Sequence, residues 1–143
     1  MNFIPLEELQ KMFNLTPAEL NKVIYHRSNM ANPGRDDKGQ PVTIYSSGIE
    51  IPEGPNKGKF VSVPGYVNGK VVTNDDELWN IWKKDIEAGT YPIYNSGKEL
   101  NKRDQEVHKI MDMDMQLMQP AFNYASPFSN PFPNSIDTGL YGQ

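Results

Sequence analysis

Residues 66–89 have the sequence YVNGKVVTNDDELWNIWKKDIEAG, in which a hairpin signal is followed at once by a helix signal. The Asn-Gly pair at 68–69 readily supplies the two positive φ angles of a type I′ turn. Asn74 before three acidic residues is typical of a helix start, because the side chain caps backbone N–H groups and carboxylates are stabilised near them. The stretch therefore predicts a β-hairpin and then a helix from Asp75, ended by Gly89.

Apolar side chains recur within that predicted helix at three- and four-residue spacing. This spacing places Leu78, Ile81, Trp82 and Ile86 on one face, which we expect to be buried. Trp82 is expected to be the central anchor of the face. Trp79 falls on a different face and is expected to matter less to folding.

Two helices are predicted before this stretch and one after it. Thr16 and Glu19 have the spacing of a capping box, which predicts a helix that ends near Arg27. Residues 98–119 contain neither glycine nor proline, so they predict one long helix stopped by Pro120. The faces expected to be apolar are Leu6, Leu9, Met12 and Phe13 in the first helix, and Leu20, Val23, Ile24 and Arg27 in the second.

Alternating apolar residues predict strands at 41–46 and 59–63, outside the hairpin. The predicted fold is α+β, with a small antiparallel sheet that includes the Asn-Gly hairpin, three to four helices and an extended C-terminal arm. The predicted organisation is an N-terminal helical hairpin at 1–27, an α+β core at 41–97, a long helix at 98–119 and an aromatic, proline-rich arm at 120–143.

Composition narrows the possible partners. The chain has 143 residues, a formal net charge of −4 and no cysteine, and 37% of its residues are hydrophobic. The negative charge argues against binding to nucleic acid or anionic lipid, and the missing cysteines exclude disulfides and thiolate metal sites. Neither a signal peptide nor an apolar run long enough to span a membrane is visible. We therefore expect a soluble protein that is not secreted by a classical signal and binds neither nucleic acid nor membrane.

No local pattern of catalytic residues stands out. The two histidines, His26 and His108, are far apart in sequence, and no serine has the context of a nucleophile elbow. Asp104, His108 and Asp112 share a helix face, but about 12 Å separates i from i+8, too far for one ion to bind both carboxylates. We expect no catalytic site, no cofactor and no bound metal.

The C-terminal end has the most unusual composition. Asp137 is the only charged residue in 120–143, and methionines crowd the preceding helix all around its circumference. Such a helix end is either enclosed between the core and the arm or used in a protein contact. Its basic residues near the start and acidic residues near the end oppose the helix dipole, which points to dependence on tertiary or intermolecular contacts. The residues predicted to bind a partner are Met111, Met115, Met118, Phe122, Tyr124, Phe128, Phe132 and Tyr141.

These observations favour a non-enzymatic structural or adaptor subunit of a larger homo- or hetero-oligomeric protein assembly. Small size, no cysteine and an adhesive tail suggest a virus or phage virion component as the particular case. A first alternative is a small binding or inhibitory module for one soluble protein, acting through the loop at 28–40 or the aromatic tail. A second is an unrecognised hydrolase with acidic residues near Trp79, Tyr91 and Tyr94 in a cleft.

Overall fold

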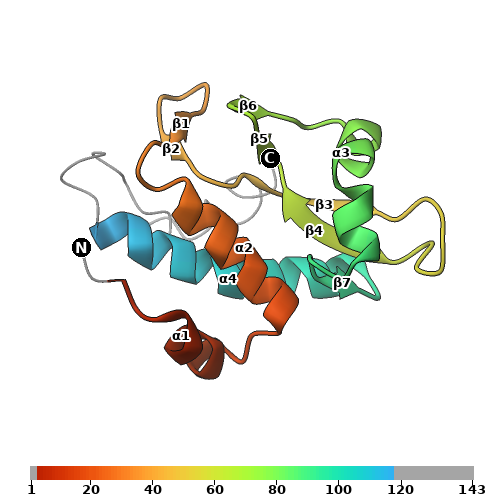
Figure 1. Ribbon diagram of the computed structural model, residues 1–143, viewed down its shortest axis with the longest axis horizontal. Coiled ribbons are helices and arrows are strands. Elements are labelled where there is room, and N and C mark those ends of the chain that lie inside the picture. The colour runs from red at the N-terminus through yellow and green to blue at the C-terminus, as the bar shows by residue number, and fades with distance from the viewer. Residues whose placement is uncertain (1–2, 118–143) are drawn as a thin grey trace.

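The computed structural model describes residues 3–117 as an α+β fold, as the sequence predicts, with four helices and small antiparallel sheets. Helix α4 runs along most of the molecule, α2 crosses in front of it, and α3 lies at the right of the view, beside β3 and β4 (Figure 1). The helices are α1 (Leu6–Phe13), α2 (Pro17–Ser28), α3 (Asp75–Glu87) and α4 (Gly97–Leu117). The strands are β1 (Gly34–Arg35), β2 (Pro41–Val42), β3 (Ser46–Glu50), β4 (Phe60–Pro64), β5 (Tyr66–Val67), β6 (Lys70–Val71) and β7 (Ile93–Tyr94).

Two helix starts have the predicted caps. The Thr16 hydroxyl accepts a hydrogen bond from the Glu19 N–H at 3.1 Å, and the Glu19 carboxylate accepts one from the Thr16 N–H at 3.0 Å. The Asn74 side chain accepts from the N–H of Glu77 at 2.9 Å. Each contact satisfies a backbone donor that lacks a partner within the helix, so the first turns of α2 and α3 are fixed locally by sequence.

The three-stranded sheet has the order β3-β4-β7, and both strand pairs are antiparallel. Ile49 lies opposite Val61 and Phe60 lies opposite Tyr94. α3 packs on this sheet and closes the first hydrophobic core, in which alternate strand residues meet the helix. The buried members of this core are Ile49, Ile51, Val61, Val63, Leu78, Trp79, Ile86 and Tyr91.

The segment predicted as one strand at 41–46 is divided into two. Tyr45 has a φ of 50°, which lies in the left-handed region and interrupts an extended chain. The N–H of Gly65 donates to the carbonyls of Ile44 and Tyr45, both at 2.9 Å, and so stabilises the bend. As a result β2 pairs with β1, whereas β3 pairs with β4.

β5 and β6 pair in antiparallel fashion on either side of Asn68 and Gly69. Asn68 has a φ of 50° and Gly69 a φ of 81°, and a type I′ turn requires two such positive angles. This pair forms a sheet of its own rather than extending the sheet of β3, β4 and β7.

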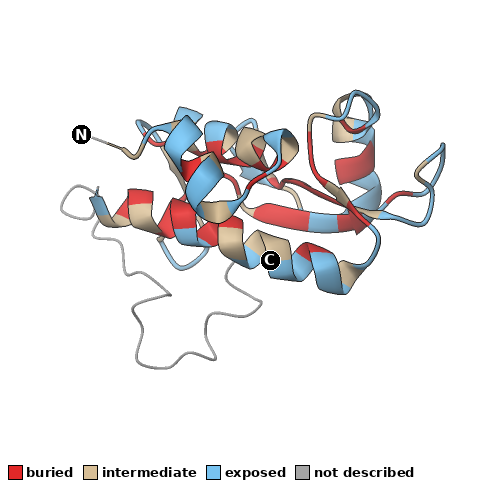
Figure 2. Cartoon of the chain, turned by 90° about the horizontal axis from the view of Figure 1, so that it is seen from below, coloured by how far each residue is buried: buried red, intermediate tan, exposed pale blue. Residues whose placement is uncertain are grey.

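A second hydrophobic core lies where α1, α2 and α4 meet. Figure 2 shows that buried positions recur along α4, which contributes to this core over several turns. Met12, predicted to be on the apolar face of α1, is instead 57% exposed, because α1 turns Leu9 inward and leaves Met12 at its flank. The buried members of this core are Leu9, Leu15, Val23, Ile44, Val107, Ile110 and Met111.

The predicted phase of α3 is wrong by part of a turn. Trp79 is 7% exposed and belongs to the first core, whereas Ile81 is 38% exposed. Trp82 lies half-buried at the edge of that core, where its Nε1 donates to the Pro64 carbonyl at 2.8 Å. Its ring makes edge contacts with Tyr25 and Tyr91. The three- and four-residue spacing of apolar residues alone placed Trp82 at the centre of the buried face. Its indole N–H needs a polar partner, however, and such a partner is available at the edge of a core.

We therefore expect Trp79→Ala to lower the free energy of unfolding by about 3–5 kcal/mol, because it leaves a cavity in the first core. Trp82→Ala should cost less, about 1–3 kcal/mol, because it removes one hydrogen bond and two edge contacts from a half-buried position. Urea denaturation followed by far-ultraviolet circular dichroism measures both losses. A larger loss for Trp82→Ala than for Trp79→Ala would contradict this assignment.

Candidate functional site

α2 and α4 face each other through ionisable side chains. These side chains also contact hydroxyl groups on the strands and on the segment before them, and we call the whole set of contacting residues the polar seam. The residues of α2 are Glu19, Lys22, His26 and Arg27, those of α4 are Arg103, Asp104, His108 and Asp114, and the other polar members are Thr43, Ser46, Ser62 and Tyr94.

Lys22 lies at the centre of the polar seam and its side chain is fully buried. Its ammonium donates to the hydroxyls of Ser46 and Ser62 and to Asp104 Oδ1, the last at 2.7 Å. The Ser62 hydroxyl is also 2.8 Å from Asp104 Oδ1. The three donors of the ammonium therefore all have acceptors, which is the condition for burying this charge.

A Ser-Lys arrangement can act as nucleophile and base in some hydrolases, so this cluster needs a chemical test. A base must be a neutral amine, but the Lys22 ammonium is paired with the Asp104 carboxylate. Ser46 and Ser62 are 1% and 0% exposed, so a substrate has no path to either hydroxyl in this conformation. In this conformation the cluster joins α2 and α4 to the sheet.

Glu19 joins the start of α2 to α4. Arg103 forms a two-point contact with its carboxylate, from Nε at 2.8 Å and Nη2 at 2.9 Å, and the Tyr94 hydroxyl donates to it at 2.6 Å. Burial acts to raise the pKa of Glu19, but the hydrogen bonds from Arg103, Tyr94 and Thr16 outweigh burial and bring the pKa below its ordinary value. Glu19 is therefore a carboxylate in the folded protein at neutral pH.

His26 and Arg27 meet Asp114 at the other end of the seam. Arg27 donates to both carboxylate oxygens of Asp114, at 2.8 and 3.0 Å. Burial holds the pKa of His26 below its ordinary value of 6.5, so its ring is neutral. A neutral ring satisfies both neighbours if Nε2–H donates to Asp114 at 3.1 Å and Nδ1 accepts from the Thr43 hydroxyl at 2.5 Å. Burial raises the pKa of Asp114, but the bonds from His26 and Arg27 bring it below normal.

Asp104 and His108 are two of the three residues considered as metal ligands on one face of α4, and both contact other groups of the protein. Asp104 is paired with Lys22, and the Nδ1 of His108 lies 2.7 Å from the backbone carbonyl of Asp104. Burial, and then the charge of Lys22, lower the pKa of His108 to about 3. Within residues 3–117 no three His, Asp or Glu side chains come together as a group that could hold a metal ion. The expectation that the protein needs no metal stays a prediction.

The buried face of α2 was predicted incorrectly. Ile24, expected to be inside, is 44% exposed, and Glu19, Lys22 and His26 are buried beside Val23. A pattern of apolar residues does not indicate such a face, because three of its buried residues are polar. Their hydrogen-bond and ion-pair partners on α4 lie far along the chain. The available signal was the i, i+3 and i+7 spacing of the three polar residues, which matches one helix face.

Trp79, Tyr91 and Tyr94 do not line a cleft. Trp79 and Tyr91 belong to the first core, and the Tyr94 hydroxyl is bonded to Glu19. The three side chains are 7%, 6% and 9% exposed. The cleft expected near these residues in the hydrolase alternative is therefore not formed by them in this conformation.

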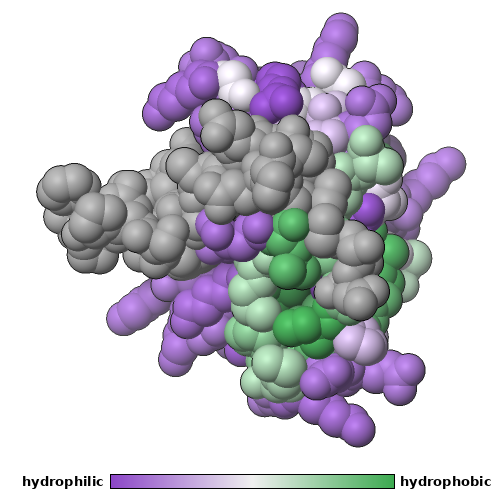
Figure 3. All heavy atoms as spheres, turned by 90° about the vertical axis from the view of Figure 1, so that its left-hand side faces the viewer, coloured by the Kyte–Doolittle hydropathy of each residue, from purple (hydrophilic) through white to green (hydrophobic). Residues whose placement is uncertain are grey.

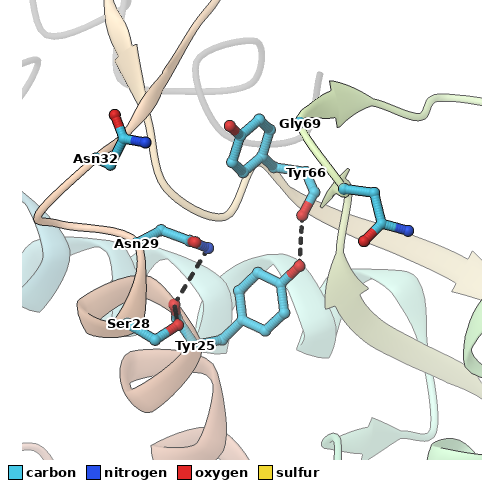
Figure 4. A pocket seen from close by; sticks show the side chains of 7 residues that line it. Tyr25, Ser28, Asn29, Asn32, Tyr66 and Gly69 are labelled. Atoms are coloured by element: carbon cyan, nitrogen blue, oxygen red, sulfur yellow. Dashed lines mark hydrogen bonds between the residues drawn. The ribbon is translucent and has the colours of Figure 1, made fainter.

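A polar hollow of about 440 Å³ lies between the end of α2, the loop that follows it and the β5–β6 pair (Figure 4). The Tyr25 hydroxyl donates across it to the Tyr66 carbonyl at 2.5 Å. A Cβ at Gly34 would lie 2.5 Å from the Tyr66 hydroxyl oxygen, so a larger residue there would require the Tyr66 ring to move. The hollow is lined by Tyr25, Ser28, Asn29, Asn32, Tyr66, Asn68 and Gly69.

The predicted partner-binding residues fall into two groups. Met111 and Met115 are 5% and 4% exposed, and Met111 is part of the second core. The other six, Met118, Phe122, Tyr124, Phe128, Phe132 and Tyr141, lie outside the described residues. In this conformation Met111 and Met115 point away from solvent, and their contact with a partner stays a prediction.

Met113 and Leu117 are the apolar residues that the end of α4 presents outward. Leu117 is 46% exposed and Met113 is half-buried. Figure 3 faces this end of the molecule and shows apolar residues gathered on it between polar borders. The sequence predicts apolar residues all around this helix end, whereas in the structure Met111 and Met115 are buried and the apolar residues at 110, 113 and 117 form one row that becomes exposed toward its end.

Comparisons of the chain with protein-family models, curated proteins and solved structures find no match. Within residues 3–117, no helix is both long enough and apolar enough to cross a membrane.

The polar seam predicts a loss of stability in acid. The pKa values of His26, His108, Glu19 and Asp114 all lie below their ordinary values in the folded state, so the unfolded chain binds more protons as pH falls. The histidine contribution is lost from about pH 6.5 downward, at up to about 1.4 kcal/mol per pH unit for each ring. The carboxylate contribution is lost at lower pH, through the lowered pKa values.

Urea unfolding at pH 7.5 and 5.0 measures this dependence. We expect a clearly lower free energy of unfolding at pH 5.0, and a smaller difference between the two pH values for His108→Gln, which removes one titrating ring. Equal stability at both pH values in the unaltered chain would show that folding does not lower the pKa values of the two histidines, and would contradict this account.

Proposed function

We propose that this protein is a non-enzymatic structural or adaptor subunit of a larger protein assembly, joined to its neighbours through the end of α4 and residues 120–143. The observation that carries the proposal is the contrast between the two parts of the chain. In residues 3–117 the buried charges of the seam are matched by partners within the fold. The residues that follow carry five aromatic side chains and one charge.

The physical argument concerns conformational entropy. A segment with many prolines and without helical or strand period gains little by folding alone, but its aromatic side chains gain free energy when buried in a partner. Each buried Phe contributes about 1.5–3 kcal/mol, so several can offset the cost of ordering the segment. The prolines restrict the backbone beforehand and reduce that cost. An arm of this composition suits a subunit laid against neighbours.

The first assembly to test is a virus or phage particle, on the sequence grounds of small size, no cysteine and an adhesive arm. Homo-oligomeric and hetero-oligomeric contacts are both compatible with one aromatic arm per chain. Neither version needs a cofactor or a catalytic group.

The polar hollow favours a second candidate function, a small binding or inhibitory module for one soluble protein. Ser28, Asn29 and Asn32 line it from the loop at 28–40, and Asn68 lines it from the β5–β6 turn. A row of amide groups of this kind can bind the backbone of a peptide segment. In this alternative the full chain forms a complex of defined small size rather than joining a larger assembly.

Deletion of the arm tests the favoured proposal. A chain that ends after Gln119 is expected to unfold cooperatively, with a melting temperature near that of the full chain, because both described cores lie in residues 3–117. It is expected to sediment as a monomer. The full chain, of 16.2 kDa, is expected to sediment as a larger species, alone or in an extract of its natural source.

A full-length chain with Phe122→Ser, Phe128→Ser and Phe132→Ser is the matched control, because it keeps the length and the prolines but removes aromatic surface. It should sediment like the truncated chain. The proposal fails if truncation unfolds the protein, or if both altered chains assemble as the unaltered chain does.

A further inference from the structure

The end of α4, the segment before α1 and the first residue of α1 together form an apolar surface, which we call the apolar margin. It consists of Ile4, Leu6, Met113 and Leu117. Ile4 and Leu6 are partly buried and pack against the second core, to which Ile110 of α4 belongs. Arg27 places Ile4 beside the last turns of α4, because its guanidinium donates to the Ile4 carbonyl at 2.8 Å and to Asp114.

Exposure increases along α4 toward this margin. Ile110, Met113 and Leu117 occupy one row of the helix at i, i+3 and i+7 spacing. Ile110 is fully buried, Met113 is half-buried and Leu117 is 46% exposed. The apolar row therefore continues beyond the cover that the other described elements provide. Leaving a large apolar side chain in water at the end of such a row forgoes stabilisation that a covering segment would supply.

The chain itself supplies a segment at this place. Residue 118 follows directly on Leu117, and Pro120 cannot continue the hydrogen bonding of a helix. Phe122 comes five positions after Leu117, so even an extended backbone keeps it within about 17 Å. Residues 118–136 carry no charge, so nothing in that segment opposes contact with an apolar surface. A short tether also gives the aromatic ring an effective concentration on the order of millimolar.

We propose that the apolar margin is the docking site for the first part of the chain's own C-terminal arm, with Phe122 as the anchoring side chain. The margin then fixes the direction in which the arm leaves the body. The later aromatics, Phe128, Phe132 and Tyr141, stay available to a neighbouring subunit. This inference rests on the proposed function for those later residues but not for the docking of Phe122 itself.

The absence of cysteine permits a direct test by disulfide trapping in the full-length chain. Ile4→Cys with Phe122→Cys pairs the margin with the proposed anchor. Lys109→Cys with Phe122→Cys is the matched control, because the Lys109 side chain is 51% exposed and lies eight residues before Leu117, about 12 Å along α4 and within reach of the tether. Both are incubated with oxidised glutathione, and the products are separated on non-reducing gels.

We expect the Ile4/Phe122 pair to form an intrachain disulfide in the monomer at least tenfold faster than the Lys109/Phe122 pair. Equal rates for the two pairs would overturn the proposal, because they would show that Phe122 does not prefer the margin. Disulfide-linked dimers that become more abundant with protein concentration would also overturn it, because the margin would then receive the arm of a second copy.

Hydrogen exchange provides a measurement without cysteines, in case Ile4→Cys disturbs the fold. Phe122→Ser is expected to increase the exchange rate of amides in the first turn of α1 and the last turns of α4, and to leave α3 unchanged. Unchanged exchange in α1 and α4 would overturn the docking. Both measurements are made on the isolated chain, so they are independent of assembly. If Phe122 forms the disulfide with the margin but the chain never assembles, the proposed function alone is contradicted. If the chain assembles but Phe122 does not form the disulfide, the docking alone is contradicted.

Discussion

The buried ion pair between Lys22 and Asp104 is the contact on which the arrangement of the helices depends. Lys22 comes from α2, Asp104 from α4, and the hydroxyls of Ser46 and Ser62 come from β3 and β4. One charged cluster thus joins four elements that belong to two hydrophobic cores. Charges placed in a protein interior are tolerated only if partners satisfy them, so the cluster also restricts α2 and α4 to one register. Apolar side chains alone would allow more ways of packing two helices.

The same seam compensates for charges that the dipole of α4 does not favour, in a helix whose start is stabilised by Ser96 and Glu99. α4 has basic residues toward its start and acidic residues toward its end, opposite to what the helix dipole stabilises. In the structure, Arg103 is bonded to Glu19, and Asp114 to Arg27 and His26. Tertiary ion pairs therefore replace the missing dipole stabilisation. The apolar row of Ile110, Met113 and Leu117 is buried at Ile110 and becomes exposed toward Leu117, where the described part of the chain ends.

Local signals predicted the α+β class and the starts of α2 and α3, because caps act over three or four residues. The contacts that the sequence left unresolved are made between distant residues. The seam joins Glu19 to Arg103 and His26 to Asp114, and the spacing along α2 places these polar residues on one face without indicating their partners. The phase of α3 was wrong for a related reason, because Trp79 and Trp82 differ in their partners, the first core and the Pro64 carbonyl, rather than in hydrophobicity. For the candidate site, composition predicts an arm at 120–143, outside the described residues, but only the fold shows the apolar margin at the end of α4.

The most direct test of this account is a double-mutant cycle on Lys22 and Asp104, with free energies of unfolding measured in urea at pH 7.5. If the ion pair fixes the packing of α2 on α4, Lys22→Met and Asp104→Leu should each cost about 3–5 kcal/mol, because each leaves one buried charge unpaired. The double variant should then be more stable than the sum of the two losses implies, by about 2 kcal/mol or more. Losses that add within about 0.5 kcal/mol would show that the two residues act independently and would contradict the account.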